Sequence, residues 1–168
     1  MFKGLQKTKG ADAGTADSLW STELILDDDY TKKAIEFIRS ARTEIRICAY
    51  AWRWYEYAPE DKIQQFNIAI VRAIQRGVTV RALVERINEG AVLQRHGIKV
   101  KALNTMRTLH TKAILVDDKT LILGSHNFTQ RAQNDNFEMS IATQDFEACV
   151  LFESYFDRMW DANGKSIN

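Results

Sequence analysis

The sequence contains few of the residues that crosslink secreted proteins or bind metals. Among its 168 residues there are two cysteines, three histidines and one proline. The cysteines form no C-x-x-C pair, and the widely spaced histidines form no H-E-x-x-H motif. We therefore expect neither a disulfide framework nor a zinc site, and no cofactor. Cys48 and Cys149 lie among apolar residues and are predicted to be buried free thiols.

Long apolar runs are also absent. No stretch approaches the ~20 residues that span a bilayer, and residues 1–17 lack the apolar centre of a signal peptide. We therefore expect a cytoplasmic protein without a membrane partner. The length predicts one domain. Residues 1–22, rich in glycine, lysine and small polar residues, are predicted to be a flexible arm, and residues 23–168 a single domain.

The hydrophobic pattern alternates between helical and extended periods. Helical spacing follows Asp27 to Asp29 and Pro59, and it recurs twice later. Helices alternating with strands early, and adjacent strands late, predict an α/β fold with a mixed β-sheet flanked by helices on both faces. The predicted helices cover residues 30–41, 63–74, 91–96 and 145–161, and the predicted strands cover residues 44–50, 78–84, 98–102, 113–116, 120–123 and 136–143.

Two charged residues precede the apolar run 113–116. In extended backbone, side chains two residues apart project on the same face, so a strand that includes His110 and Lys112 pairs a titratable imidazole with a cation. An isolated histidine is more often hydrogen-bonded in the core. A lysine on an otherwise buried strand needs a polar partner, and a phosphate is a suitable one.

The predicted hairpin brings a second polar group back beside His110. Gly124 suits a sharp turn or a close backbone approach, and Ser125 and Asn127 can donate hydrogen bonds to an oxyanion. Glu138 lies near the start of the next strand. A carboxylate bonded to one imidazole nitrogen fixes the tautomer and raises the basicity of the other, which suits an orienting role. A solvated strand residue is the alternative for Glu138.

Together, H-x-K-x4-D from His110 to Asp117, G-S-x-N from Gly124 to Asn127, and Glu138 resemble the signature of the phospholipase D superfamily. A single copy of the motif in a short chain is most similar to the small bacterial Nuc-type endonucleases. The resemblance extends over about residues 30–161 and implies a phospholipase D/nuclease-like fold with metal-independent phosphodiester chemistry. The catalytic residues that it implies are His110, Lys112, Ser125, Asn127 and Glu138. Asp117 lies beyond the buried part of its strand, so we interpret Asp117, with Gly124, as structural.

Several residues outside this motif are candidates for substrate binding. The segment 90–116 contains five lysines or arginines and no acidic residue, a distribution that attracts nucleic acid or anionic lipid headgroups. The aromatic run 50–57 can stack on bases, bury a subunit interface or support a lid. His126 occupies the variable position of G-S-x-N, where contact with substrate and simple exposure are both open. The candidates are Arg107, His126, Trp52 and Arg53.

In-line displacement at phosphorus needs a nucleophile on one side and an acid on the other. One chain supplies a single H-x-K, so the resemblance implies a homodimer with the active site at its two-fold interface. The sequence thus favours a metal-independent nuclease that hydrolyses DNA or RNA through a phosphohistidine intermediate. The alternatives are a phospholipase D or phosphatidyl transferase that acts on phospholipids, and a non-catalytic nucleic-acid-binding module.

Overall fold

The computed structural model describes residues 22–103 and 106–166. The predicted flexible arm, residues 1–22, therefore lies outside the described residues except for Thr22. Within the described part, no helix combines the length and the apolar character needed to cross a membrane.

One mixed sheet of eight strands forms the centre of the fold, in the order β1-β7-β6-β5-β2-β3-β4-β8. β2, β3 and β4 are parallel to one another, and the other pairs of neighbours are antiparallel. The strands are β1 (Glu23–Leu26), β2 (Glu44–Ala49), β3 (Thr79–Val84), β4 (Lys99–Leu103), β5 (Ala113–Val116), β6 (Thr120–Gly124), β7 (Met139–Thr143) and β8 (Gly164–Ser166).

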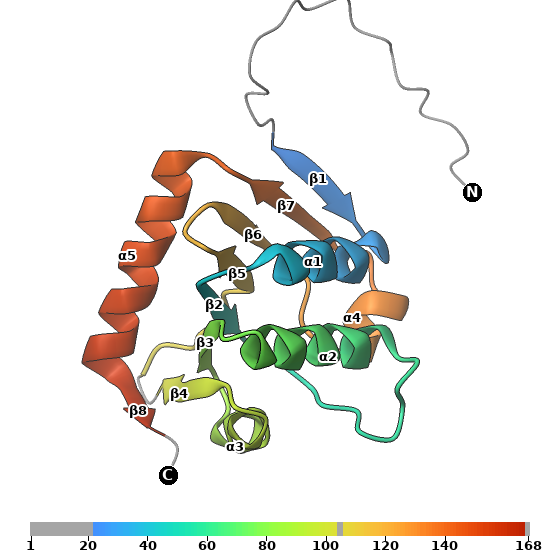
Figure 1. Ribbon diagram of the computed structural model, residues 1–168, viewed down its shortest axis with the longest axis horizontal. Coiled ribbons are helices and arrows are strands. Elements are labelled where there is room, and N and C mark those ends of the chain that lie inside the picture. The colour runs from blue at the N-terminus through green and yellow to red at the C-terminus, as the bar shows by residue number, and fades with distance from the viewer. Residues whose placement is uncertain (1–21, 104–105, 167–168) are drawn as a thin grey trace, which may run out of the picture.

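Helices cover both faces of this sheet, which confirms the predicted fold class. α1 and α2 run side by side, while α5 lies apart from them (Figure 1). Consecutive residues of β2 show the two faces: Ile47 belongs to the large core cluster beneath α1 and α2, and Cys48 packs with Phe156 of α5. The helices are α1 (Asp29–Ser40), α2 (Lys62–Gln75), α3 (Ile87–Arg95), α4 (Gln130–Asn134) and α5 (Phe146–Asn163).

The limits of α2 follow from local chemistry. The Asp61 side chain accepts hydrogen bonds from the backbone N–H groups of Ile63 (2.8 Å) and Gln64 (3.1 Å), which satisfies two donors that have no partner within the helix. Beyond the last turn, Gly77 has a φ of +92°, a left-handed conformation that favours glycine. The helix therefore ends at Gln75, one residue beyond the predicted range 63–74.

β2 is buried on both faces, because α5 covers Arg46 and Cys48. Three sequence-based predictions need correction. α3 begins at Ile87, before the predicted residue 91, and β7 begins at Met139 rather than residue 136. β5 begins at Ala113, so the histidine and lysine of the motif precede the strand instead of lying on it. The short elements β1, α4 and β8 were not predicted.

Arg46 of β2 is a charged residue buried beneath α5, and its side chain is only 7% exposed. Its guanidinium forms ion pairs with Glu44 and Glu153, each at 3.0 Å, with Asp118, and with Asp157 at 3.7 Å. A buried cation is tolerated when carboxylates surround it. These ion pairs therefore attach α5 to the sheet.

The two cysteines confirm the prediction of buried free thiols. Burial raises the pKa of Cys48 to about 12. The pKa of Cys149 is also raised, chiefly by burial and secondarily by the nearby charge of Asp145.

Candidate active site

The motif residues other than Asp117 converge at one end of the central strands of the sheet. β5 runs antiparallel to both β2 and β6, with Ala113 opposite Cys48 and Leu123, so the residues before β5 and after β6 emerge together. Two backbone hydrogen bonds continue this alignment: Gly124 N–H donates to Lys112 O (3.2 Å), and Ser125 N–H donates to Met139 O (3.0 Å). The hairpin therefore returns G-S-x-N to the H-x-K segment, as predicted.

Gly124 is required here because two backbones approach closely. A Cβ built on Gly124 would collide with Oγ and Cα of Ser140 and with the carbonyl oxygen of Met139 on β7. This is the close approach that the sequence suggested for Gly124.

His110 and Lys112 form a contacting pair. The Lys112 ammonium lies 3.1 Å from each ring nitrogen of His110 and donates to the His110 carbonyl oxygen at 2.8 Å. The His110 side chain is exposed, whereas Lys112 is buried. Tyr50, which follows β2, packs against both residues, with its ring centroid 4.6 Å from that of His110 and 5.0 Å from the ammonium. The sequence placed Tyr50 in the aromatic run but gave it no role.

Lys112 is a buried cation without a matching anion. Among the described residues, no carboxylate lies within ion-pair distance of its ammonium. Burial lowers the pKa of Lys112, and the more distant charge of Glu138 only partly opposes this effect. Since a buried charge is costly unless it is paired, the site is electrostatically suited to an incoming anion.

Glu138 forms hydrogen bonds with residues other than His110, the partner predicted from the sequence. Its carboxylate accepts hydrogen bonds from Ser125 Oγ and from Asn136 Nδ2 (2.8 Å), while its backbone N–H donates to Asp27 Oδ1 (2.9 Å). No hydrogen bond between Glu138 and His110 occurs among the described residues, because the two nearer polar side chains engage both carboxylate oxygens. Glu138 therefore orients Ser125 within this chain.

Asn127 completes the motif at the end of β6. It is half-buried, and its Oδ1 is buried with no hydrogen-bond partner in the described part of the chain. The next residue, Phe128, is held by a hydrogen bond from its N–H to Ala51 O (3.0 Å). The Asn127 amide is therefore fixed at the edge of the site with hydrogen-bonding capacity unused.

Asp117 lies at the other end of β5 from His110. Its carboxylate accepts hydrogen bonds from Arg42 N–H (2.7 Å), from Thr43 N–H and Oγ1 (both 2.8 Å), and from Glu44 N–H (3.0 Å). Burial alone would raise the pKa of Asp117, but these hydrogen bonds hold it below its ordinary value. Asp117 joins the β5–β6 turn to the start of β2, which is a structural position.

Two candidate substrate-binding residues prove to be core residues. His126 is fully buried: Nδ1 is 2.7 Å from Ser140 Oγ, Nε2 is 2.9 Å from Asp27 O, and the ring stacks on Tyr30 at 4.3 Å. Trp52 is also buried, and its indole N–H donates to Asn67 Oδ1 at 2.7 Å. With their polar atoms engaged inside the protein, neither side chain offers a free hydrogen-bonding group to a substrate, so the structure does not support an exposed polar contact from either residue.

The other two candidates are accessible. Arg107 is exposed on the segment that leads to His110. Arg53 has a side chain that is 47% exposed and forms an ion pair with Glu89 at 3.0 Å. Glu85 was missed by sequence reasoning: its Oε2 accepts a hydrogen bond from Leu109 N–H at 2.7 Å and thereby fixes the backbone next to His110.

Comparisons with known proteins agree with this geometry. Residues 34–160 match the sequence model of the family described as "Cardiolipin synthase, PLD-like domain". The chain is 28% identical over 135 residues to the mitochondrial cardiolipin hydrolase of Mus musculus, covering 77% of this chain and 57% of that protein. It is 39% identical over 106 residues to a phospholipase D of Rickettsia conorii, covering 60% of this chain and 50% of that protein. The chain thus spans about half the length of these relatives.

A solved structure shows the same fold. Nuc from Salmonella typhimurium, described as a phospholipase D family member, superposes with a TM-score of 0.73 over 87% of this chain and 98% of that one, at 22% identity. The family match covers most of the chain and includes every motif residue from His110 to Glu138. This chain therefore belongs to the phospholipase D superfamily, with the fold of Nuc.

Proposed function

We propose that this chain is a metal-independent phosphodiesterase that cleaves nucleic acid through a phosphohistidine intermediate on His110, within a homodimer. One observation carries the proposal. The exposed His110 contacts the buried ammonium of Lys112, which has no carboxylate partner among the described residues. A phosphodiester supplies the missing negative charge, and its phosphorus then lies within reach of the imidazole.

The proposed chemistry proceeds by two in-line displacements. A ring nitrogen of His110 attacks phosphorus, and the bond to the leaving alkoxide breaks while a second His110 gives that oxygen a proton. The second histidine, now neutral, takes a proton from water, whose oxygen attacks phosphorus and releases the first histidine. Lys112 and the side-chain N–H groups of Asn127 bind the phosphoryl oxygens, where charge accumulates in the transition state, and Ser125 helps when its hydroxyl hydrogen turns from Glu138 to the substrate.

The homodimer follows from the need for two histidines on opposite sides of phosphorus. His126 cannot serve as the second, because it is buried with both ring nitrogens engaged. Exposed apolar side chains also flank Ser125 and Glu138 in sequence: Leu123 is 38% exposed, Phe137 99% and Met139 58%. A second copy that completes the site across a two-fold axis would cover such residues.

Nucleic acid is the preferred substrate because the segment 90–116 carries exposed cations, of which Arg107 lies three residues before His110. Arg95, Lys99 and Arg107 are exposed within a segment that contains no acidic residue. Phospholipid is the second candidate, favoured by the names of the relatives, cardiolipin hydrolase and phospholipase D. A protein that binds nucleic acid without turnover is the third.

The test is a turnover assay in EDTA with DNA, RNA, phosphatidylcholine and cardiolipin offered side by side. We expect cleavage of DNA or RNA, with a bell-shaped pH profile because one imidazole must be neutral and its mate protonated. Lys112→Ala should lose at least ~100-fold in rate, and His110→Ala should lose turnover altogether. Lys119→Ala, which removes an exposed lysine from the other end of β5, is the matched control. Turnover of lipid alone, or loss of activity in EDTA, would contradict the proposal.

The dimer is tested separately by dilution and by mixing subunits. Specific activity should fall as the protein is diluted below its dimer dissociation constant. Heterodimers of wild-type and His110→Ala subunits should be severely impaired, because each site needs both histidines. A fully active monomer in analytical ultracentrifugation would refute both the dimer and the paired-histidine mechanism.

A further inference from the structure

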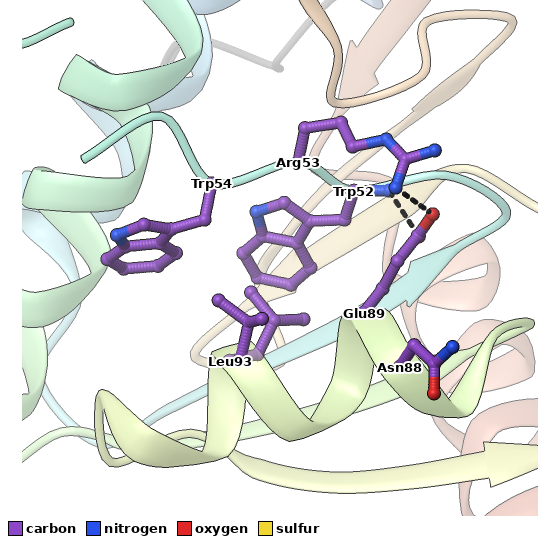
Figure 2. Close-up of a pocket in the computed structure, with 7 residues that line it drawn as sticks. Trp52, Arg53, Trp54, Asn88, Glu89 and Leu93 are labelled. Atoms are coloured by element: carbon purple, nitrogen blue, oxygen red, sulfur yellow. Dashed lines mark hydrogen bonds and ion pairs between the residues drawn. The ribbon is translucent and has the colours of Figure 1, made fainter. Parts of the chain in front are cut away.

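A pocket of about 190 Å³ lies beside the proposed active site, between the segment that follows β2 and the first turns of α3 (Figure 2). The two sites share a backbone connection. Arg53 N–H donates to Phe128 O at 2.9 Å, and Phe128 directly follows Asn127. Tyr50, which contacts His110, also lies only two residues before Trp52 at the pocket. The pocket is therefore joined by short stretches of backbone to both His110 and Asn127.

Glu89 places a buried acceptor at the pocket. Its side chain is 5% exposed, and Oε2 accepts a hydrogen bond from Trp52 N–H at 3.0 Å. Oε1 has no hydrogen-bond partner among the described residues and lies 3.0 Å from Nη1 of Arg53 in an ion pair. In Figure 2 the Arg53 side chain reaches over to this carboxylate from the loop side. Rotation of Arg53 toward solvent would leave Oε1 ready to accept an N–H group from a ligand.

Trp54 gives the pocket a rigid planar wall. Its indole stacks on His96 with a centroid distance of 3.8 Å and an interplanar angle of 9°, which restricts the ring. Val92 of α3 adds a second apolar surface. Since sites for drug-sized ligands usually measure about 300–1,000 Å³, a pocket of about 190 Å³ suits one planar ring system rather than a lipid.

The charges around Glu89 favour a polyanion. Arg53 and Arg86, with side chains 47% and 53% exposed, lie 3.0 and 3.9 Å from Oε1. Two cations around one carboxylate leave a net positive charge, which attracts phosphates and disfavours the ammonium headgroup of a lipid. A ligand that joins a planar ring with hydrogen-bond donors to a phosphate meets all these features.

We propose that this pocket binds one nucleobase of the substrate, next to the phosphodiester that His110 attacks. The inference rests on the nuclease function proposed above. The base stacks on Trp54, its exocyclic amino group donates to Glu89 Oε1, and Arg53 turns from Glu89 to the neighbouring phosphate. The exposed Asn88 amide contacts the edge of the base. Bases with an exocyclic amino group, such as cytosine, are therefore preferred over thymine at this position.

The test uses single-stranded oligonucleotides with one phosphodiester flanked by phosphorothioate linkages, which keep the negative charge that Arg53 binds and are cleaved more slowly. The nucleotide beside the cleavable bond carries cytosine, thymine or no base, and kcat/KM is measured for each. Stacking and one hydrogen bond predict about tenfold faster cleavage with cytosine than with the abasic nucleotide. Trp54→Leu should bring this ratio close to one. Gln94→Ala, on an exposed part of α3 outside the pocket, should keep the wild-type ratio.

Glu89→Gln tests specificity as distinct from structure. The glutamine keeps one oxygen for Trp52 N–H but presents N–H donors in place of Oε1, so the preference should shift from cytosine toward thymine, whose O4 accepts. If this buried substitution prevents folding, the proposal is tested by Trp54→Leu alone, through its ratio of kcat/KM between the cytosine and the abasic substrates. Equal cleavage of the three substrates by the wild type, or an unchanged ratio in Trp54→Leu, would overturn the base pocket alone. Failure to cleave any of them would overturn the nuclease function and the pocket with it.

Discussion

Replacement of Asp117 separates structural from catalytic members of the motif. Asp117 accepts four hydrogen bonds from the segment Arg42 to Glu44. Hydrogen bonds to charged groups contribute about 1.5–3 kcal/mol each. The segment is near the surface, however, so water replaces the carboxylate after truncation, and we take about 1 kcal/mol per bond. Asp117→Ala also places alanine at a φ of +51°, which costs about 1 kcal/mol.

The four lost hydrogen bonds and the strained alanine together should lower the free energy of unfolding of Asp117→Ala by about 4–5 kcal/mol. For a domain of this size, that loss corresponds to a decrease in Tm on the order of 10 °C. Asp117→Asn retains an acceptor and tolerates the left-handed conformation, so it should lose about half as much. Urea and thermal unfolding followed by circular dichroism measure both variants, and Lys119→Ala in the same turn is the control.

The stabilising contribution of Asp117 should also depend on pH. The pKa of Asp117 is lower in the folded state than in the unfolded state. Its contribution to stability is therefore fully present above the unfolded pKa of about 3.9 and is lost as the pH falls through the folded value. The difference in stability between wild type and Asp117→Asn should shrink in acid. Neutral surface substitutions usually change stability by about 0.5 kcal/mol or less. An Asp117→Ala variant whose stability differs from that of the wild type by no more than about 0.5 kcal/mol would refute the reasoning. Loss of turnover at temperatures where the variant is still folded would also refute it.

Gly124→Ala should destabilise the fold by more than about 2 kcal/mol in urea unfolding, because its Cβ collides with β7. Burial lowers the pKa of His126, so wild-type stability should fall as the pH drops below about 6.5, and His126→Asn should flatten that dependence. Cys48, with a pKa of about 12, should resist thiol reagents at neutral pH until the protein unfolds. DNA affinity should fall steeply with salt because Arg95, Lys99 and neighbouring cations neutralise phosphates; a flat dependence would contradict this.

Local patterns were sufficient for most elements of the fold. Apolar spacing predicted α1, α2 and α5. In the structure the limits of α2 are set by Asp61 and Gly77, because capping depends on neighbouring residues. Short elements were missed for a physical reason. β1 has only four residues, and it is a strand because its backbone pairs with β7, more than a hundred residues away in sequence. Such pairing leaves little trace in a short segment.

The sequence by itself determined which residues carry the candidate chemistry. The spacing of His110, Lys112, Gly124 and Asn127 identified them through its resemblance to the phospholipase D signature, and the β5–β6 hairpin brings these positions together at one end of the strands. The close approach at Gly124 could be expected for the same reason, since it depends on the backbone rather than on distant side chains.

Tertiary packing decided which neighbouring polar and aromatic residues face the site. Trp52 and His126 look like candidates for substrate binding in the sequence, yet both are buried because helices and strands remote in sequence cover them. Glu138 binds Ser125 and Asn136, since those side chains are nearer than His110 once the chain is folded. Tyr50 is adjacent to His110 because β2 pairs with β5. Burial and proximity of this kind depend on contacts between distant segments, and no local pattern in the sequence encodes them.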